Sequence, residues 1–157
     1  MKICVRLSLL AFGCMALAFC TSLPPVTIIA IAPEHHPAYL QALSDLRTAR
    51  WLLEHVPGDW VRVNDEINAV KKIDDAINEI KKAAIDDGKD INDHVAVDEK
   101  PDHPGRLHDA ADLLRKARAD INQEADTPMT QGLQNRAGQH IDAAIAFVEN
   151  AIRAVNN

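Results

Sequence analysis

Cysteine is nearly absent from this sequence. Its three cysteines, Cys4, Cys14 and Cys20, all lie in the first twenty residues, so a mature form cut near residue 20 would keep at most one of them. Neither an intramolecular disulfide nor a thiolate metal cluster could then form. Aromatic residues are scarce too, at 4%, whereas hydrophobic residues make up 47% and charged residues 25%. This composition is typical of a folded helical protein and not of a disordered chain.

The diagnostic motifs of several catalytic and cofactor-binding proteins are also missing. There is no Glu-x-x-His pair for a di-iron site, no Cys-x-x-Cys-His for a covalent haem, no His-Glu-x-x-His and no glycine-rich phosphate loop. Residues 86–98 are rich in aspartate but lack the glycine at the sixth position and the terminal glutamate in register that an EF-hand loop needs. No characterised family is indicated, and we predict a protein that is not an enzyme.

The first twenty residues have the layout of an export signal. Lys2 and Arg6 precede an apolar run over residues 7–19, as the charged and hydrophobic regions of a signal peptide do. We therefore predict residues 1–20 to be a signal peptide and residues 21–35 to be a flexible or apolar linker. The folded domain is then expected over residues 36–157, a length that suits a single core.

The position of cleavage stays open. Ala16-Leu17-Ala18 fits the small-x-small rule of ordinary cleavage, whereas residues 17–20 resemble a bacterial lipobox in which the bulky Phe19 precedes Cys20. An uncleaved anchor is the third interpretation. We predict an exported protein, periplasmic or secreted, and keep a lipid-anchored or membrane-tethered form, attached through its N-terminus, as the alternative.

The chain is acidic. Its 17 Lys and Arg residues against 23 Asp and Glu residues give a net charge of −6, and removal of Lys2 and Arg6 leaves 15 against 23, or −8. Nucleic-acid binding needs a concentrated basic surface that releases counterions from phosphates, so we expect no nucleic-acid partner. The lysine pairs at 71–72 and 81–82 could contact a membrane or an acidic partner, but a solvated helix face explains them as well.

Hydrophobic periodicity predicts four helices, over residues 36–56, 59–87, 104–124 and 128–155. Pro37, Pro104 and Pro128 suit the first turn of a helix, and Asp59 suits an N-cap. Apolar residues recur three and four positions apart, and Leu46, Ile77, Leu114 and Ile145 are expected in the buried seam. In the second helix the predicted seam runs through Val63, Ile67, Val70, Ile73, Ile77, Ile80 and Ala84.

The second half of the chain repeats the first. His36-Pro37 corresponds to His103-Pro104 at a shift of 67, and the IDDAI segment at 73–77 corresponds to IDAAI at 141–145 at a shift of 68. We therefore predict an all-α four-helix bundle built from two tandem-duplicated helical hairpins, 36–87 and 104–155, joined by a loop over 88–103. The length of that loop leaves the topology open between up-down-up-down and a crossover arrangement.

The duplication also repeats charged residues beside the seam. Arg47, Arg50 and Asp74 in the first half correspond to Arg115, Arg118 and Asp142 in the second. Arginine holds carboxylates well, so this pattern predicts ion pairs between helices, with an anion-binding cleft as the alternative. Trp51 and Trp60 flank the first turn, and we expect them to pack against each other at the end of the bundle.

Histidines and aspartates of the second half form a candidate metal site. His108 and Asp112 stand four residues apart on one helix face, and His140 is expected opposite them on the next helix. With His94 or His103 from the loop they could bind zinc or copper(II). Isolated histidines beside a helical seam are more often solvated or bonded to a backbone carbonyl. Both interpretations of these histidines, as metal ligands and as ordinary side chains, stay open.

The sequence therefore predicts an exported bacterial protein with a non-catalytic accessory or protein-interaction role in the cell envelope. The alternative is a periplasmic metal or small-ligand binding protein that uses the His and Asp residues of the second hairpin and the loop. The partner and the oligomeric state do not follow from the sequence.

Overall fold

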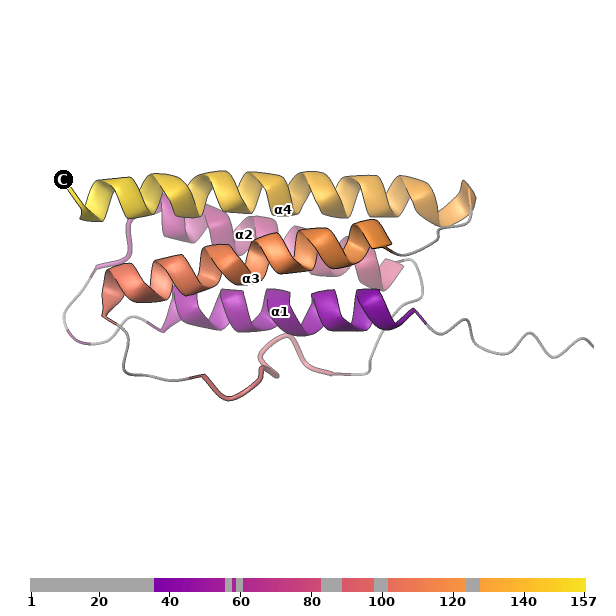
Figure 1. The fold of residues 1–157 in the computed structure, drawn as a ribbon, viewed down its shortest axis with the longest axis horizontal. Helices are drawn as coiled ribbons and strands as arrows, with labels where there is room; N and C mark the ends of the chain where they lie inside the picture. The colour runs from indigo at the N-terminus through magenta and orange to yellow at the C-terminus, as the bar shows by residue number, and fades with distance from the viewer. Residues whose placement is uncertain (1–35, 56–57, 59–60, 83–88, 98–101, 124–127) are drawn as a thin grey trace, which may run out of the picture. The chain divides into compact units, whose positions relative to one another are not determined.

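The computed structural model describes residues 36–157 except 56–57, 59–60, 83–88, 98–101 and 124–127. These residues form four α-helices and no strand: α1 (Pro37–Glu54), α2 (Asn64–Lys82), α3 (His103–Gln123) and α4 (Pro128–Val155). The helices pack side by side as a four-helix bundle (Figure 1), which confirms the all-α, four-helix part of the predicted fold. None of the described helices has the length and apolarity needed to cross a bilayer.

Local sequence signals account for the helix ends. Proline occupies the first turn of α1 and is the first residue of α4, where its missing N–H costs no hydrogen bond. The Asp102 side chain accepts a hydrogen bond from the Gly105 N–H at 3.0 Å and so caps α3. Helix α2 has acidic residues in its first turn and lysines in its last turn, as the helix dipole favours.

The start of α2 was predicted wrongly. The helix begins at Asn64 instead of following Asp59, which itself lies outside the described residues. Residues 61–63 are not helical, and Val61 is 86% exposed. Asn64 is a good N-cap type and two acidic residues follow it, so the stronger start signal comes five residues later than expected. The turn between α1 and α2 is therefore longer than predicted.

Ion pairs and hydrogen bonds between helices define their directions. Helices α1 and α3 are antiparallel neighbours, because Asp45 contacts Lys116 while Trp51, farther along α1, contacts Arg106 near the start of α3. Helices α2 and α4 are also antiparallel, because Glu79 pairs with Arg136 and the earlier Asp75 lies near the later His140. Each hairpin is antiparallel as well, so α2 and α3 run in the same direction (Figure 1). The topology is the crossover arrangement.

The core is a single aliphatic cluster with contributions from all four helices. Its largest fully buried apolar side chains are Tyr39, Leu43, Leu46, Leu53, Ile73, Ile77, Ile80, Leu107, Leu114, Ile121 and Ile141. Three seam predictions were wrong: Ile67 is 37% exposed, Ile145 is only partly buried, and Val63 is partly buried and precedes the helix. In α2 the other predicted seam residues from Val70 to Ile80 are buried, and the buried stripe starts at Glu66 instead of Ile67. Ala84 lies outside the described residues.

The described part of the connection between α2 and α3, Lys89 to Val97, runs alongside α1 and is called the crossover segment below (Figure 1). Arg47 donates to the Lys89 carbonyl at 3.4 Å, and Arg50 donates to the Asn92 side chain at 3.1 Å. Ile91 and Val97 pack against the core. The segment therefore covers one side of α1 that would otherwise face solvent.

Candidate functional site

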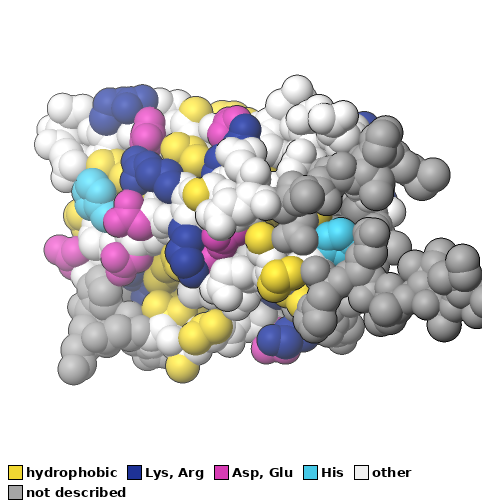
Figure 2. Space-filling view, turned by 45° about the vertical axis from the view of Figure 1, so that its right-hand side comes forward, with side chains coloured by type: hydrophobic (Ala, Val, Ile, Leu, Met, Phe, Trp, Pro, Cys, Tyr) yellow, Lys and Arg dark blue, Asp and Glu magenta, His cyan; other side chains and the backbone are white. Residues whose placement is uncertain are grey.

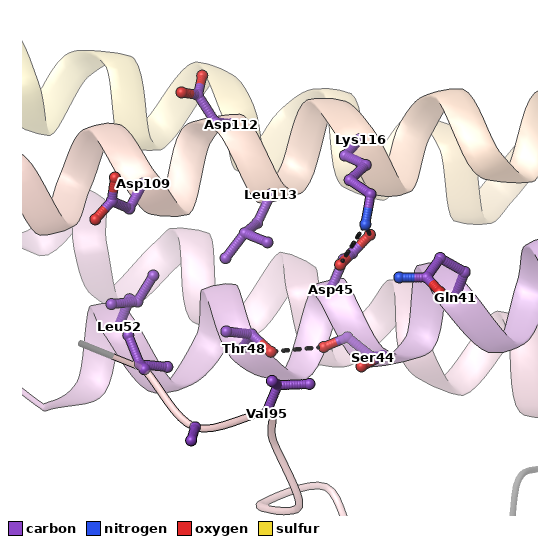
Figure 3. A pocket seen from close by; sticks show the side chains of 12 residues that line it. Gln41, Ser44, Asp45, Thr48, Leu52, Val95, Asp109, Asp112, Leu113 and Lys116 are labelled. Atoms are coloured by element: carbon purple, nitrogen blue, oxygen red, sulfur yellow. Dashed lines mark hydrogen bonds and ion pairs between the residues drawn. The ribbon is translucent and has the colours of Figure 1, made fainter.

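A cleft of about 610 Å³ lies between α1, α3 and the crossover segment. Its apolar lining consists of Leu52, Leu113, Val95, Ala96 and Val97, and its polar lining of Gln41, Ser44, Asp45, Thr48, Asp109, Asp112 and Lys116. Figure 3 shows Leu113 projecting from α3 towards α1, with Val95 of the crossover segment on the near side. Concave sites of this kind, with apolar walls and a few converging polar groups, are the usual form of small-ligand sites.

An ion pair marks one end of the cleft (Figure 3). The Lys116 Nζ atom lies 2.9 Å from Oδ2 of Asp45 and 3.1 Å from its Oδ1. Asp45 is only 6% exposed, whereas half of the Lys116 side chain is exposed. Burial raises the pKa of the nearby Asp120, and the negative charge of Asp45 raises it further, while Lys116 lowers it. The positive charge of Lys116 therefore stabilises the ionised carboxylates of both Asp45 and Asp120.

The other end of the cleft has two further carboxylates on α3. Asp112 points away from α1 in Figure 3 and accepts a hydrogen bond from Arg115 at 2.8 Å. Asp109 is exposed at the rim, one turn from Leu113, and its carboxylate forms no hydrogen bond or ion pair within the described part of the chain. Asp109 is therefore the carboxylate of the lining whose charge is not matched by a neighbouring side chain.

The hydroxyl of Thr48 is engaged within α1. It donates to the Ser44 carbonyl at 2.9 Å, one helical turn earlier. This bond leaves the Thr48 methyl group and the neighbouring leucines as the apolar surface of the cleft wall. The cleft thus combines an apolar middle with charged ends, an arrangement that orients an elongated ligand.

The five predicted metal ligands lie in different surroundings. His108 is exposed on α3, and Asp112 is held by Arg115. His140 does not face them, because its Nδ1 atom lies 3.7 Å from Asp75 of α2. The prediction placed His140 opposite α3, but α4 contacts both α2 and α3, and this residue lies on its α2 side.

His94 of the crossover segment and His103, the first residue of α3, also have different partners. His94 lies against the Trp51 ring, with 4.7 Å between ring centroids, and its Nδ1 atom is 2.8 Å from the Val95 carbonyl oxygen. His103 is buried, with Nε2 3.0 Å from Oε1 of Glu66. In the part of the chain that the structure describes, no group of three or more His, Cys, Asp or Glu residues is placed to hold a metal ion.

Besides His94, the Trp51 ring contacts two further side chains. His55 stacks on it with 4.5 Å between ring centroids, and the Arg106 guanidinium lies 5.1 Å from the ring centroid. Trp60, its predicted partner, lies outside the described residues. Glu66 and Arg106, both buried, were not predicted, because charged residues are normally assigned to the solvent face.

The predicted ion pairs between helices are confirmed. Arg50 Nε lies 2.8 Å from Oδ1 of Asp74, and Arg118 Nε lies 3.0 Å from Oδ1 of Asp142. In each case the arginine also donates to the residue four positions later, Glu54 or Asn122. The other repeated arginines differ: Arg47 is buried under the crossover segment, whereas Arg115 is half-exposed and pairs with Glu149 at 3.0 Å.

Comparison with protein-family models gave no match, and comparisons with curated proteins and with solved structures gave none either. The bundle, the cleft and the residues that line it are therefore the basis from which function is inferred.

Proposed function

We propose that this protein is a non-catalytic binding protein of the bacterial envelope and that the cleft between α1 and α3 is its ligand site. The observation that carries the proposal is the cleft itself, whose volume of about 610 Å³ falls within the roughly 300–1,000 Å³ of small-molecule sites. The aliphatic side chains of its lining offer apolar surface, and the charged residues at its ends can orient a ligand.

The contacts of the polar lining support binding in preference to catalysis. Asp45 and Lys116 neutralise each other, and the Thr48 hydroxyl is bonded to the backbone of its own helix. An activated nucleophile instead needs a general base within hydrogen-bond reach and a third group that orients this base. Asp45, Lys116 and Thr48 thus form an ion pair and a backbone hydrogen bond, and they do not form a nucleophile with its general base.

A small ligand fits the surface better than a protein partner does. The crossover segment lies along the cleft and restricts the room available there. On the face shown in Figure 2, acidic and basic side chains stand next to one another and divide the exposed hydrophobic ones. Protein-docking sites are usually larger continuous apolar patches. We therefore favour the small-ligand interpretation over the accessory protein-interaction role.

The envelope location is proposed from residues 1–20, which lie outside the described residues. Their charged start and apolar run are the features that export machinery uses. Mass spectrometry of the protein isolated from its native host tests this part: we expect an N-terminus beyond residue 15, with or without a lipid on Cys20. Intact Met1 in a soluble cytoplasmic fraction would contradict export.

We further propose that the bundle arose by tandem duplication of a helical hairpin. The two Arg–Asp pairs support this origin, since each spans 24 residues and each arginine has a second partner four positions later. The antiparallel packing of α1 on α3 and of α2 on α4 is what two identical hairpins related by a two-fold axis would give. An experimental structure in which residues 36–87 and 104–155 superimpose only one helix at a time would contradict it.

A pair of matched variants tests the ligand site. Ala96 is an exposed residue of the cleft lining, and Ala154 is an exposed residue of α4 that does not line it. In a fragment screen by NMR, we expect shift changes grouped at the cleft residues. Ala96→Phe should abolish them by filling the cleft, while Ala154→Phe should leave them intact. Hits distributed over the whole surface, or hits insensitive to Ala96→Phe, would refute the assignment.

A further inference from the structure

We propose that the ligand of the cleft between α1 and α3 is a small organic cation, an amine or guanidinium joined to an apolar body. This inference rests on the proposed function, in which the cleft is a ligand site. The charged residues of the lining are three carboxylates, Asp45, Asp109 and Asp112, and one ammonium, Lys116. Lys116 pairs with Asp45 and Arg115 pairs with Asp112, so three carboxylates against two cations leave one negative charge, that of Asp109. A cation lowers the electrostatic energy of such a site, whereas an anion raises it.

Lys116 is poorly suited to receive an anion. Its ammonium already lies 2.9 Å from Asp45, whose side chain is only 8% exposed. A ligand carboxylate would have to compete for this ammonium and would leave the buried Asp45 without its counter-ion. Removing the partner of a buried charge is strongly unfavourable. The Asp45–Lys116 ion pair is therefore part of the lining of the cleft and is not a binding site for an anion.

Asp109 provides the counter-ion for the ligand. It stands at the opposite end of the cleft from Lys116 (Figure 3), and no described residue pairs with it. The exposed Asp112 is already held by Arg115. A cationic group beside Asp109 would gain an ion pair without breaking one, which neither Asp45 nor Asp112 allows.

The apolar body would lie on the aliphatic wall between the two ends. Leu113 projects into the cleft from α3, and Leu52 of α1 and Val97 of the crossover segment complete the wall. Val95 is 62% exposed, so a ligand that covers it removes apolar surface from water, which favours binding. A bare metal ion would not use this surface, and no described cluster of carboxylates and histidines is placed to hold one. The lining thus selects an amphipathic organic cation.

Three probes of one shape and different charge test this inference on the protein as recovered from its host: naphthylmethylamine, naphthylmethanol and naphthoate. Affinities are measured by calorimetry and the site by NMR shifts of Leu52, Leu113 and Val97. We expect the amine to bind most tightly and naphthoate least tightly. Equal binding of all three in the cleft would refute the charge selectivity and leave the ligand site standing, whereas binding of none up to millimolar concentration would refute both.

A matched pair of variants tests whether Asp109 is the residue that makes the cleft prefer a cation. Asp109→Asn should weaken amine binding by about fivefold, the value of a good exposed ion pair, and should leave naphthylmethanol binding unchanged. Asp65→Asn removes the same charge from α2, away from the cleft, and should change neither affinity. Equal losses in both variants would show a general effect of net charge and overturn the role of Asp109.

Discussion

The Nε2 atom of His103 lies 3.0 Å from Oε1 of Glu66, and this contact joins the first turn of α3 to the first turn of α2. Glu66 is fully buried and His103 nearly so. A buried carboxylate is costly unless a hydrogen-bonding partner compensates its lost hydration. The contact also fixes the starts of two parallel helices from different hairpins at the same level of the bundle.

Replacing Glu66 should therefore destabilise the fold well beyond the effect of a surface residue. We expect Glu66→Ala to lower the free energy of unfolding by about 3–5 kcal/mol, because a buried polar partner is left uncompensated and a cavity opens. Asp65→Ala, in the same turn but less buried, should cost at most about 1 kcal/mol through the helix dipole. Urea unfolding of both variants measures the difference, and equal losses would contradict a structural role for the contact.

The core assignment makes a second stability prediction. Leu114 is fully buried, so Leu114→Ala should cost about 2–5 kcal/mol of unfolding free energy. Its neighbour Leu113 is only partly buried at the wall of the cleft, and Leu113→Ala should cost clearly less. The melting temperatures of the two variants measure this difference in stability. An unchanged melting temperature for Leu114→Ala would show that the buried seam of α3 is misassigned.

Helix number, order and most of the core were predictable from the sequence because aliphatic periodicity is a strong local signal. The Arg50–Asp74 and Arg118–Asp142 pairs were predictable because the repeat doubled the evidence for them. Ile67 and Glu66 show the limit of such patterns. One apolar residue at a plausible spacing cannot reveal that the neighbouring glutamate is the buried residue and that it meets a histidine 37 residues away.

The cleft could not be predicted, because its walls come together only through the crossover. Val95 and Val97 belong to a segment with no periodicity, and its path along α1 depends on contacts such as that of Arg47 with the Lys89 carbonyl. The prediction of a metal site did not take account of how the helices and the crossover segment pack. It combined residues by sequence spacing and hairpin geometry, whereas the rotation of α4 places His140 beside Asp75 of α2.

Metal titration provides a third prediction. His108, Asp112, His140, His94 and His103 have separate partners or surroundings, and a zinc or copper site needs three or four ligands at about 2.0–2.3 Å from one ion. We therefore expect no saturable binding of either metal near micromolar concentration in calorimetry. Saturable binding that is lost in both His108→Ala and His140→Ala would show that these two residues meet on one ion, contrary to their placement.

Glu79 should stabilise the fold in a pH-dependent way. Hydrogen bonds from Lys82 and Arg136 lower its pKa from the ordinary value of 4.5, and the Arg136 contact ties α2 to α4 at 2.8 Å. A lowered pKa in the folded state means that this stabilisation is present above pH 4.5 and is lost as the pH falls through the folded value. Glu79→Gln should thus lower the melting temperature at pH 7 and have a smaller effect in acid. A loss that is independent of pH would contradict the ionic origin.

Asp120 should show the opposite dependence on pH. Burial, aided by the charge of Asp45, raises its pKa above the ordinary value of 3.8, so ionised Asp120 is less favourable in the folded than in the unfolded chain. The resulting destabilisation is present when the pH exceeds the folded pKa and disappears below about 3.8, where both states are protonated. We expect Asp120→Asn to raise the melting temperature at pH 7, and this gain to vanish as the pH approaches 3. Asp109→Asn, at an exposed site on the same helix, should leave the melting temperature nearly unchanged at both pH values. If the two variants gave the same gain, relief of the overall negative charge would be its cause, and the partly buried position of Asp120 would not explain it.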